Sequence, residues 1–381
     1  MKPEIEILRD LVAIPSVSSI SNQPMIDYVV KELDRRAWKI YFYPYRDAAG
    51  IEKNNLVAVT RSRYVTKPEL ALVCHTDTVP FDATWKEAVN PRIRNGKLYG
   101  RGSCDVKGFL ACVLASISRI DVRRLSKPLA LALTADEEIG CAGAKYLAGK
   151  NAIGARYTIV GEPTGLAPVR AGKGYALAEI VVRGREAHSA FPTEGRSAIY
   201  DGARVVTRLE RIAKKLAARK NRSFDPPFTT LNVGLIRGGT AKNIVPGECR
   251  ITVEWRPIPG QDPRWAAELI REELARLARD RPGLDARLNI KRLDPPFDPA
   301  ATGYLAALLE SLTHRRSTTV SFGTEAAHLS AATSEAVVFG PGDMTVAHKT
   351  GEFVPTPELS KCTAYLSAVI QKLCAEGITK L

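Results

Sequence analysis

Residues 70–77 read Leu-Ala-Leu-Val-Cys-His-Thr-Asp, an apolar run that ends in a histidine and an aspartate. Similar short apolar runs lie at Leu56–Val59 and Leu129–Leu133, and Ile159–Val160 continues the series. Runs of this length between breakers suit strands that are buried on both faces of a sheet. Helical patterns alternate with them, so the first 170 or so residues predict an α/β fold.

Residues that can bind a metal follow several of these runs. In chain order they are His75, Asp105, Asp136-Glu137-Glu138, Glu162 and His348, with Asp77 two residues after the first histidine. Imidazoles and carboxylates are the usual ligands of catalytic zinc, and ligand sites in open α/β sheets lie beyond the strand ends. A carboxylate close to such ligands but not bound to the metal can act as a general base. The set predicts a pair of divalent ions that activates water for hydrolysis.

Taken singly, each motif has a simpler explanation. Asp105 could cap a helix that begins in its glycine-rich segment, and Asp136-Glu137-Glu138 could be a solvated helix start. Three adjacent carboxylates after a buried strand would repel one another, however, and divalent cations remove that repulsion. The combination of all the motifs therefore favours the metal site.

The pattern changes between residues 174 and 289. This segment holds strand-like and helix-like stretches in the order β-α-β-β-α-β, which is the ferredoxin-like plan; they lie at 175–182, 197–216, 231–236, 250–255, 264–277 and 286–290. His348 follows the segment whereas the other candidate ligands precede it. We therefore expect a discontinuous catalytic domain of residues 1–173 and 290–381 that carries residues 174–289 as an insert.

Composition narrows the class of protein. The 381 residues are 45% hydrophobic and 25% charged, as in ordinary globular domains, and seven cysteines without CxxC spacing suggest buried thiols. No apolar stretch approaches the roughly 20 residues of a membrane span, and the acidic start does not resemble a signal peptide. The formal net charge is +14, but the sequence contains no recognised nucleic-acid-binding motif. A positive field that attracts small anions is the simpler interpretation of this charge. We expect a cytoplasmic protein with neither a nucleic-acid nor a membrane partner.

The motifs closely resemble those of the M20 family of metallopeptidases and deacylases, in the same order along nearly the whole chain. The matching stretches are His75–Phe81, Leu98–Gly102, Thr134–Glu138, Gly161–Thr164, Asn243, Arg256–Gly260, Thr324–Ala326 and Phe339–Gly342. The chain departs from the family's usual Asp-Met-Lys-Gly by having Asp105-Val106-Lys107-Gly108 after Cys104. That change preserves the aspartate.

The resemblance implies a zinc-peptidase-like α/β catalytic domain, with a mixed sheet flanked by helices, and an inserted ferredoxin-like lid through which the protein forms a homodimer. It implies two divalent ions, zinc or alternatively cobalt, bridged by Asp105, with a cis peptide bond after that residue. One ion would be bound by His75 and Glu162, and the other by Glu138 and His348. Glu137 would be the general base and Asp77 would orient His75. His188 and Asn243 would reach the partner subunit's site, and Arg256, Gly323 and Thr324 would hold the substrate's carboxylate.

The resemblance also narrows the substrate to a small N-acyl amino acid, first of all N-acetyl-L-ornithine, whose hydrolysis gives L-ornithine and acetate in arginine biosynthesis. Acetylcitrulline, succinyl-diaminopimelate and dipeptides, or peptides cut by a carboxypeptidase, remain alternatives. A non-catalytic, metal-dependent binding protein for amino-acid derivatives is the second class of hypothesis, and the intact Glu137 speaks against it.

Overall fold

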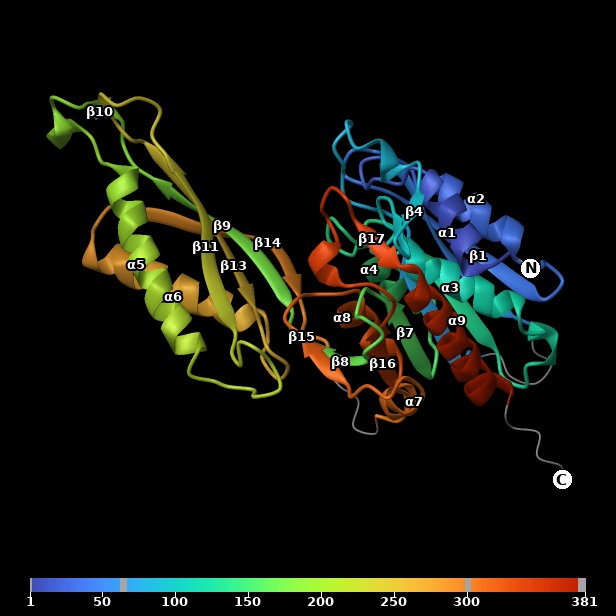
Figure 1. The fold of residues 1–381 in the computed structure, drawn as a ribbon. Coiled ribbons are helices and arrows are strands. Elements are labelled where there is room, and N and C mark those ends of the chain that lie inside the picture. Colours follow the sequence, from blue (N-terminus) through green and yellow to red (C-terminus); the bar gives the residue numbers. More distant parts are fainter. Residues whose placement is uncertain (1, 62–66, 299–302, 376–381) are drawn as a thin grey trace. The chain divides into compact units, whose positions relative to one another are not determined.

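The computed structural model describes residues 2–61, 67–298 and 303–375, and the chain divides into two compact units (Figure 1). Unit 1 is made of residues 1–170, 299–318 and 324–381, and unit 2 of residues 171–298 and 319–323. The second unit thus extends beyond the expected end of the insert at residue 289. Strand β14 (Asp285–Asp294) pairs with β9 (Tyr175–Arg183) up to its last residue, which accounts for this extension as far as Asp294.

Unit 1 is built on a mixed sheet of eight strands in the order β1-β2-β6-β3-β7-β16-β8-β15. Its strands are β1 (Trp38–Arg46), β2 (Glu52–Thr60), β3 (Leu70–His75), β6 (Leu129–Thr134), β7 (Tyr157–Gly161), β8 (Val169–Gly172), β15 (Thr318–Val320) and β16 (Glu335–Phe339). The four central strands, β6, β3, β7 and β16, are parallel to one another, so their carboxyl ends share one edge. A small antiparallel sheet adds β4 (Arg92–Arg94), β5 (Lys97–Tyr99) and β17 (Phe353–Pro355).

Every residue of β3 and β6 is buried. Because successive side chains of a strand point to opposite faces, this burial requires cover on both faces of the sheet. The helices of unit 1 supply it; they are α1 (Glu4–Ala13), α2 (Gln23–Glu32), α3 (Lys107–Ser118), α4 (Ala142–Gly149), α7 (Tyr304–Thr313), α8 (Ala326–Leu329) and α9 (Thr356–Ile370). Burial on both faces explains why these strands appear in the sequence as unbroken apolar runs.

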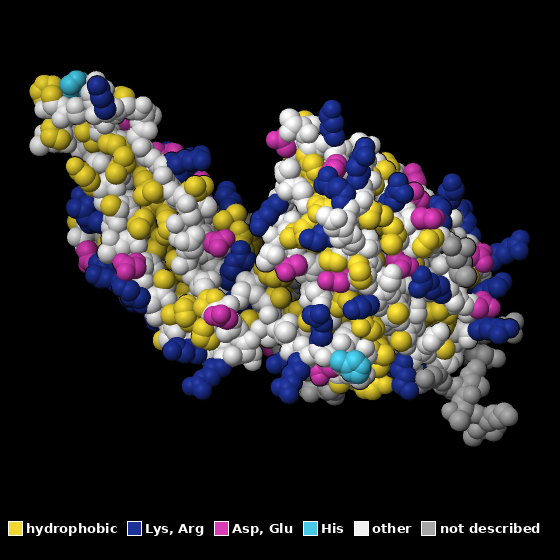
Figure 2. Space-filling model, viewed as in Figure 1, with side chains coloured by type: hydrophobic (Ala, Val, Ile, Leu, Met, Phe, Trp, Pro, Cys, Tyr) yellow, Lys and Arg dark blue, Asp and Glu magenta, His cyan; other side chains and the backbone are white. Residues whose placement is uncertain are grey.

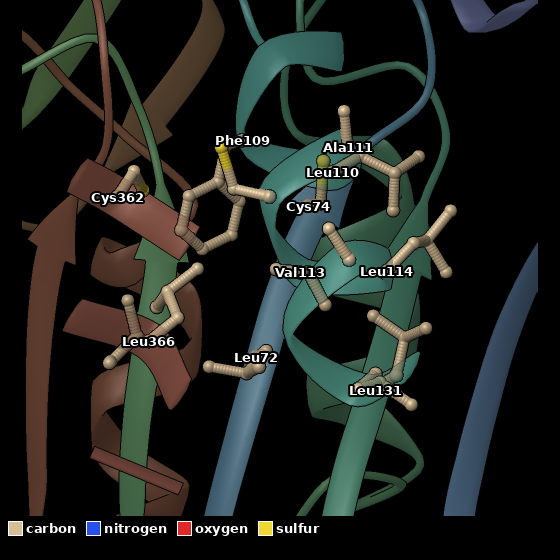
Figure 3. Packing of buried hydrophobic residues seen from close by; sticks show 14 of the residues in the cluster. Leu72, Cys74, Phe109, Leu110, Ala111, Val113, Leu114, Leu131, Cys362 and Leu366 are labelled. Atoms are coloured by element: carbon tan, nitrogen blue, oxygen red, sulfur yellow. The ribbon is translucent and has the colours of Figure 1, made fainter. Parts of the chain in front are cut away.

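The buried helix α3 forms the centre of the unit 1 core, where it packs against α1, α9 and β3. Figure 3 shows its side chains between those of the strands and those of α9, with Phe109 facing Cys362 and Leu366. A side-chain carbon added to Gly161, the last residue of β7, would lie only 2.1 Å from the Phe109 ring. Gly161 is therefore required for this close packing, which fixes the strand end that precedes Glu162.

Unit 2 has the predicted ferredoxin-like architecture. Its elements are β9, β10 (Ala187–His188), α5 (Ala198–Leu216), β11 (Thr230–Gly238), β12 (Ile244–Val245), β13 (Glu248–Arg256), α6 (Arg264–Asp280) and β14. The four long strands form an antiparallel sheet in the order β11-β13-β9-β14. Both helices pack on it around a core of their own that includes Ile180, Leu209, Ile251 and Trp255.

No helix within the described ranges combines the length and apolar character needed to cross a bilayer. All seven cysteines lie among the described residues, are buried, and form no disulfide with one another. Cys104, which stands beside Asp105 in sequence, directs its Sγ toward the Asp343 carbonyl oxygen at 3.5 Å. This buried position agrees with the expectation that the cysteines are buried thiols.

We predict that Phe109→Ala lowers the free energy of unfolding by about 3–5 kcal/mol, since the cavity left in a packed core cannot close fully. Urea unfolding followed by circular dichroism measures the loss. Phe42→Ala is the matched control, because Phe42 is 50% exposed on β1 and its truncation leaves no cavity. Equal effects of the two substitutions would contradict the assignment of Phe109 to the core.

Candidate active site

The candidate ligands follow the carboxyl ends of the four parallel strands. His75 is the last residue of β3, Glu138 follows β6, Glu162 follows β7, and His348 lies in the loop after β16. In the sheet register His75 lies opposite Thr134, and Gly161 lies opposite Phe339. Equal strand ends therefore bring segments far apart in the sequence to one edge. Asp105 comes to the same place just before α3.

Among the residues that the structure describes, two groups of side chains, both in unit 1, could each hold a metal ion. The first is His75, Asp105 and Glu162, all buried, and the second is Asp105, Glu138 and His348. Within each group the candidate ligand atoms lie within 4.8 Å of one another. Asp105 is shared by both groups, which is the arrangement expected of a bridging carboxylate.

Asp105 divides its two oxygens between the two histidines. Its Oδ1 lies 3.1 Å from His75 Nε2, and its Oδ2 lies 3.0 Å from His348 Nε2. The Glu138 carboxylate also meets the His348 ring, with its Oε2 at 3.0 Å from the same imidazole nitrogen. The peptide bond between Asp105 and Val106 is cis, as the resemblance implied.

The His75 ring contacts Asp77, the residue expected to orient it, mainly through the Asp77 backbone. His75 Nδ1 lies 3.0 Å from the backbone carbonyl oxygen of Asp77 and 3.7 Å from the nearer carboxylate oxygen. Because a carbonyl oxygen can only accept, Nδ1 donates to it. When the ring is neutral, this leaves the Nε2 lone pair available to a metal.

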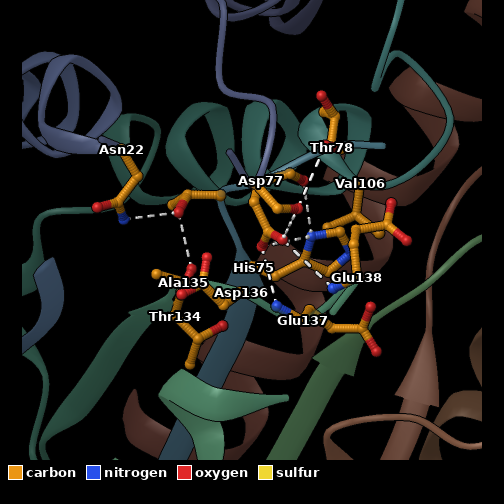
Figure 4. A network of polar contacts seen from close by, with 12 residues as sticks. Asn22, His75, Asp77, Thr78, Val106, Thr134, Ala135, Asp136, Glu137 and Glu138 are labelled. Carbon is orange, nitrogen blue, oxygen red and sulfur yellow. Dashed lines mark hydrogen bonds and ion pairs between the residues drawn. The ribbon is translucent and has the colours of Figure 1, made fainter. Parts of the chain in front are cut away.

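The Asp77 carboxylate instead holds the acidic loop after β6 (Figure 4). Its Oδ1 accepts from the Glu137 backbone N–H at 3.0 Å, and its Oδ2 accepts from the Glu138 N–H at 3.3 Å and the Ser18 hydroxyl at 2.7 Å. Asp77 therefore links the orientation of His75 to the position of the two glutamates.

Glu137 belongs to neither ligand group, although it stands next to Glu138 in sequence. Its backbone is fixed by Asp77, and its Oε1 lies 3.4 Å from the Cys141 thiol. Burial raises the pKa of Glu137 to about 8, and the nearby charge of Glu138 acts in the same direction. A half-buried carboxyl group with a raised pKa beside potential metal ligands is suited to proton transfer.

The candidate site brings several carboxylates together in a buried place, and their burial and mutual repulsion shift their pKa values. Burial, reinforced by the charge of Asp105, holds the pKa of Glu162 well above its ordinary value. Burial alone would raise the pKa of Asp105 as well, but hydrogen bonds from His348 and His75 outweigh it and keep that pKa below its usual range. Divalent cations would relieve the repulsion among these carboxylates.

A buried ion pair, which the motifs did not predict, supports Asp105 from behind. Glu352 accepts from the backbone N–H groups of Cys104 at 3.0 Å and Asp105 at 3.1 Å through Oε1, while its Oε2 accepts from Arg101 at 2.6 Å. Glu352 lies four residues after His348, so it joins two ligand-bearing loops. No local pattern could reveal this, because 248 positions separate Glu352 from Cys104.

The remaining predicted residues lie mainly in unit 2, in two places. His188 and Asn243 share the end formed by β10 and β12, where the Ser189 N–H donates to the Asn243 carbonyl oxygen at 3.0 Å. Arg256 stacks on the Tyr175 ring at 4.9 Å, and a side-chain carbon on Gly323 would lie 3.5 Å from Tyr175 Cβ. Thr324 is buried at the start of the return to unit 1.

Comparison with known proteins identifies the family. The model of peptidase family M20/M25/M40 matches residues 71–372. The chain belongs to this family. Its M20 relatives include the acetylornithine deacetylase of Myxococcus xanthus, 45% identical over 96% of each chain, and that of Proteus mirabilis (strain HI4320), 33% identical over 97% of this chain and 96% of the other. The M20 hydrolase activity predicted from the motifs is thus supported along almost the whole length.

Solved M20 structures share the fold. Aminopeptidase PepT from Bacillus cereus ATCC 10987 superposes with a TM-score of 0.77 at 20% identity, covering 97% of this chain and 98% of the other. A Bacillus subtilis protein described as a dinuclear metal binding peptidase from the M20 family gives 0.64 at 13% identity, with 97% and 98% covered. The predicted α/β architecture is confirmed by these likenesses.

The raised pKa values predict how stability depends on pH in the metal-free protein. The pKa of Glu137 rises from 4.5 to about 8 on folding, and hydrogen bonds to Asp105 and Glu138 raise that of His348 from 6.5 to about 10. Each group binds its proton more tightly when folded, so its stabilising contribution is complete below the unfolded pKa and is lost as pH rises through the folded pKa.

We therefore expect the metal-free protein to melt at a lower temperature at about pH 8.5 than at about pH 5.5. Zinc-loaded protein should show a weaker or reversed trend, because metal and protons compete for the same ligands. Differential scanning calorimetry of both forms across the pH range measures this. If the metal-free protein instead becomes more stable as the pH rises from about 5.5 to about 8.5, the raised pKa values of Glu137 and His348 are contradicted.

Proposed function

We propose that this M20 hydrolase removes the acetyl group from N-acetyl-L-ornithine, giving L-ornithine and acetate in arginine biosynthesis. The observation that carries the substrate is the 45% identity to the Myxococcus xanthus acetylornithine deacetylase over 96% of each chain. The relative from Proteus mirabilis carries the same name at 33% identity. Arginine biosynthesis would place the protein in the cytoplasm.

The donor set suits two divalent metal ions, with zinc as the first candidate and cobalt as the alternative. His75 and Glu162 would complete one site and Glu138 and His348 the other, with Asp105 shared between them. The close approach of buried carboxylates supports this, since it is costly without compensating cations. When bound, the ions would supply a water of lowered pKa for hydrolysis.

Glu137 is the proposed general base. It would accept a proton from the attacking water and return it to the departing amine, which requires a carboxyl group that changes protonation near neutral pH. Its raised pKa and its place outside both ligand groups support this role. Asp77 would act through others, because it fixes the backbone of Glu137 and the ring of His75.

Residues of unit 2 would recognise the substrate. The planar guanidinium of Arg256 would pair with the substrate carboxylate, assisted by Gly323 and Thr324. His188, with Asn243 beside it, would reach the partner subunit's site and donate to the oxygen that becomes negative as water attacks. The exposure of His188 supports its availability to a second copy.

An exposed apolar surface of unit 2 supports the proposal that two copies pair through this unit. The surface includes an edge strand of the sheet. Strand β11 is the edge strand of its sheet, and Leu235 and Ile236 on it are each 51% exposed. Ile199 and Tyr200 of the neighbouring helix α5 are exposed as well, and Figure 2 shows hydrophobic side chains gathered over this face of unit 2. An exposed edge with apolar side chains is a surface on which a second copy can pair.

We predict that Glu137→Gln lowers kcat for N-acetyl-L-ornithine by about 10²–10⁴-fold with little change in zinc content, because only proton transfer is removed. Steady-state kinetics and metal analysis measure both quantities. The same assay with N-acetylcitrulline, succinyl-diaminopimelate and dipeptides tests the substrate, and preference for any of these would replace the acetylornithine assignment. Binding without turnover in the zinc-loaded wild type would favour the non-catalytic alternative.

We also predict that Leu235→Asp shifts the protein from dimer to monomer, since a buried unpaired charge opposes association. Sedimentation velocity measures the shift. Ile93→Asp is the matched control, because Ile93 is 46% exposed on the short strand β4 of unit 1. A wild-type protein that sediments as a monomer would rule out the proposed dimer.

A further inference from the structure

Lys53 is a fully buried lysine behind the candidate active site. It lies on β2, its side chain is 1% exposed, and its ammonium donates to the carbonyl oxygens of Ser18 at 2.6 Å and Ile20 at 2.8 Å. The same ammonium forms an ion pair with Asp136 Oδ1 at 3.0 Å. Burying an ammonium is costly unless it is partnered. Here two carbonyl oxygens accept from it, and its charge is paired with Asp136 and, at 3.7 Å, with Asp47.

Asp136 opens the acidic loop but is held by different partners from Glu137 and Glu138. Its carboxylate is buried between Lys53 and the Tyr45 hydroxyl, which donates to Oδ2 at 2.7 Å. Its backbone has a φ of 58°, a left-handed conformation that Asp adopts more readily than most residues. The carboxylate therefore anchors a backbone turn, and the chain leaves that turn with the next two residues directed to the site.

Lys53 also anchors a second loop, formed by residues 16–20. This loop pairs with the segment after His75, since the Ser18 N–H donates to the Thr78 carbonyl at 3.0 Å and the Thr78 N–H donates to Ser16 at 2.9 Å. The Ser18 hydroxyl then donates to Asp77. The two loops held by Lys53 thus supply the three donors described for the Asp77 carboxylate: the Ser18 hydroxyl and the backbone N–H groups of Glu137 and Glu138.

We propose that Lys53 is a positioning residue for the hydrolysis proposed above. By binding Asp136 and the carbonyl oxygens of residues 18 and 20, it fixes the two loops that enclose Asp77. Asp77 in turn sets the position of Glu137 and, through its carbonyl oxygen, the ring of His75. Lys53 also neutralises Asp136, so that this carboxylate does not add to the negative charge beside Glu137 and Glu138.

The test compares zinc-loaded wild type with Lys53→Met, which keeps most of the side-chain volume but removes the ammonium. We expect kcat for N-acetyl-L-ornithine to fall by about 10–100-fold, as is typical when the support of a site residue is lost, with KM changed by less than about 3-fold. Hydrogen exchange of a peptide covering residues 135–142 should become faster, because the Glu137 and Glu138 amides lose their fixed acceptor.

Arg119→Met is the matched control for lost stability. Arg119 forms an ion pair with the buried Glu4 at 2.6 Å between α3 and α1. The Arg119→Met substitution should lower the melting temperature but leave kcat and the hydrogen exchange of residues 135–142 unchanged. If Lys53→Met also leaves both quantities unchanged, or changes them no more than Arg119→Met does, the proposal is overturned.

The double variant Lys53→Met with Asp136→Asn separates positioning from charge compensation. Removing both charges should recover much of the lost stability, since position 136 no longer carries an unpaired buried charge, and Asn tolerates the left-handed backbone. We expect kcat to stay low, because the carbonyl oxygens of residues 18 and 20 are still unanchored. Recovery of kcat to the wild-type value would show that Lys53 only neutralises charge.

Tyr45→Phe gives a milder variant that keeps the buried ammonium, in case Lys53→Met does not fold. It removes one hydrogen bond from Asp136 and should change kcat and exchange in the same direction by smaller factors; unchanged exchange would count against the proposal. The exchange measurement needs no substrate. If the wild type hydrolyses none of the offered compounds, the proposed function fails while the positioning role of Lys53 is still decided.

Discussion

The structure depends on how it compensates negative charge in a buried place. Asp77, Asp105 and Glu162 are each at most 5% exposed, and Asp136 and Glu352 are 1% exposed. Carboxylates so close together in a weakly polar interior would unfold the site or stay protonated unless each found a partner. The partners differ in kind. Lys53 and Arg101 neutralise the outer acids, whereas Asp77 is held by two backbone N–H groups and a hydroxyl.

This division separates supporting acids from reacting ones. Asp136 and Glu352 carry their own cations and hold loops in place. Glu138, Glu162 and Asp105 lie with His75 and His348 in the two candidate ligand groups, so they are the acids proposed to bind metal. Glu137 stands between the two sets, with a fixed backbone and a carboxyl group of raised pKa. The proposed role of Glu137 as general base follows from this combination of a fixed backbone and a carboxyl group outside the ligand groups.

The fold makes this arrangement possible because four parallel strands end together. Strand β7 brings Glu162 to the site only because Gly161 lets the Phe109 ring approach its backbone. Strand β6 ends level with β3, which places the acidic loop above Asp77. Small changes in strand register would separate the ligand atoms by several ångströms, since each residue advances a strand by about 3.3 Å.

The sequence by itself determined the elements and the candidate ligands. Buried strands left unbroken apolar runs, the β-α-β-β-α-β order of the insert was legible from its periodicities, and His75, Asp105, Glu138, Glu162 and His348 stood out as residue types with a shared chemistry. Only the tertiary structure decided what supports them. It showed that His75 Nδ1 contacts the carbonyl oxygen of Asp77, and that residues 171–298 and 319–323 form the second compact unit. It also revealed Lys53 and Glu352, whose partners lie far along the chain and leave no local pattern. Local patterns reflect burial and periodicity, whereas the pairing of buried charges depends on which loops the sheet brings together.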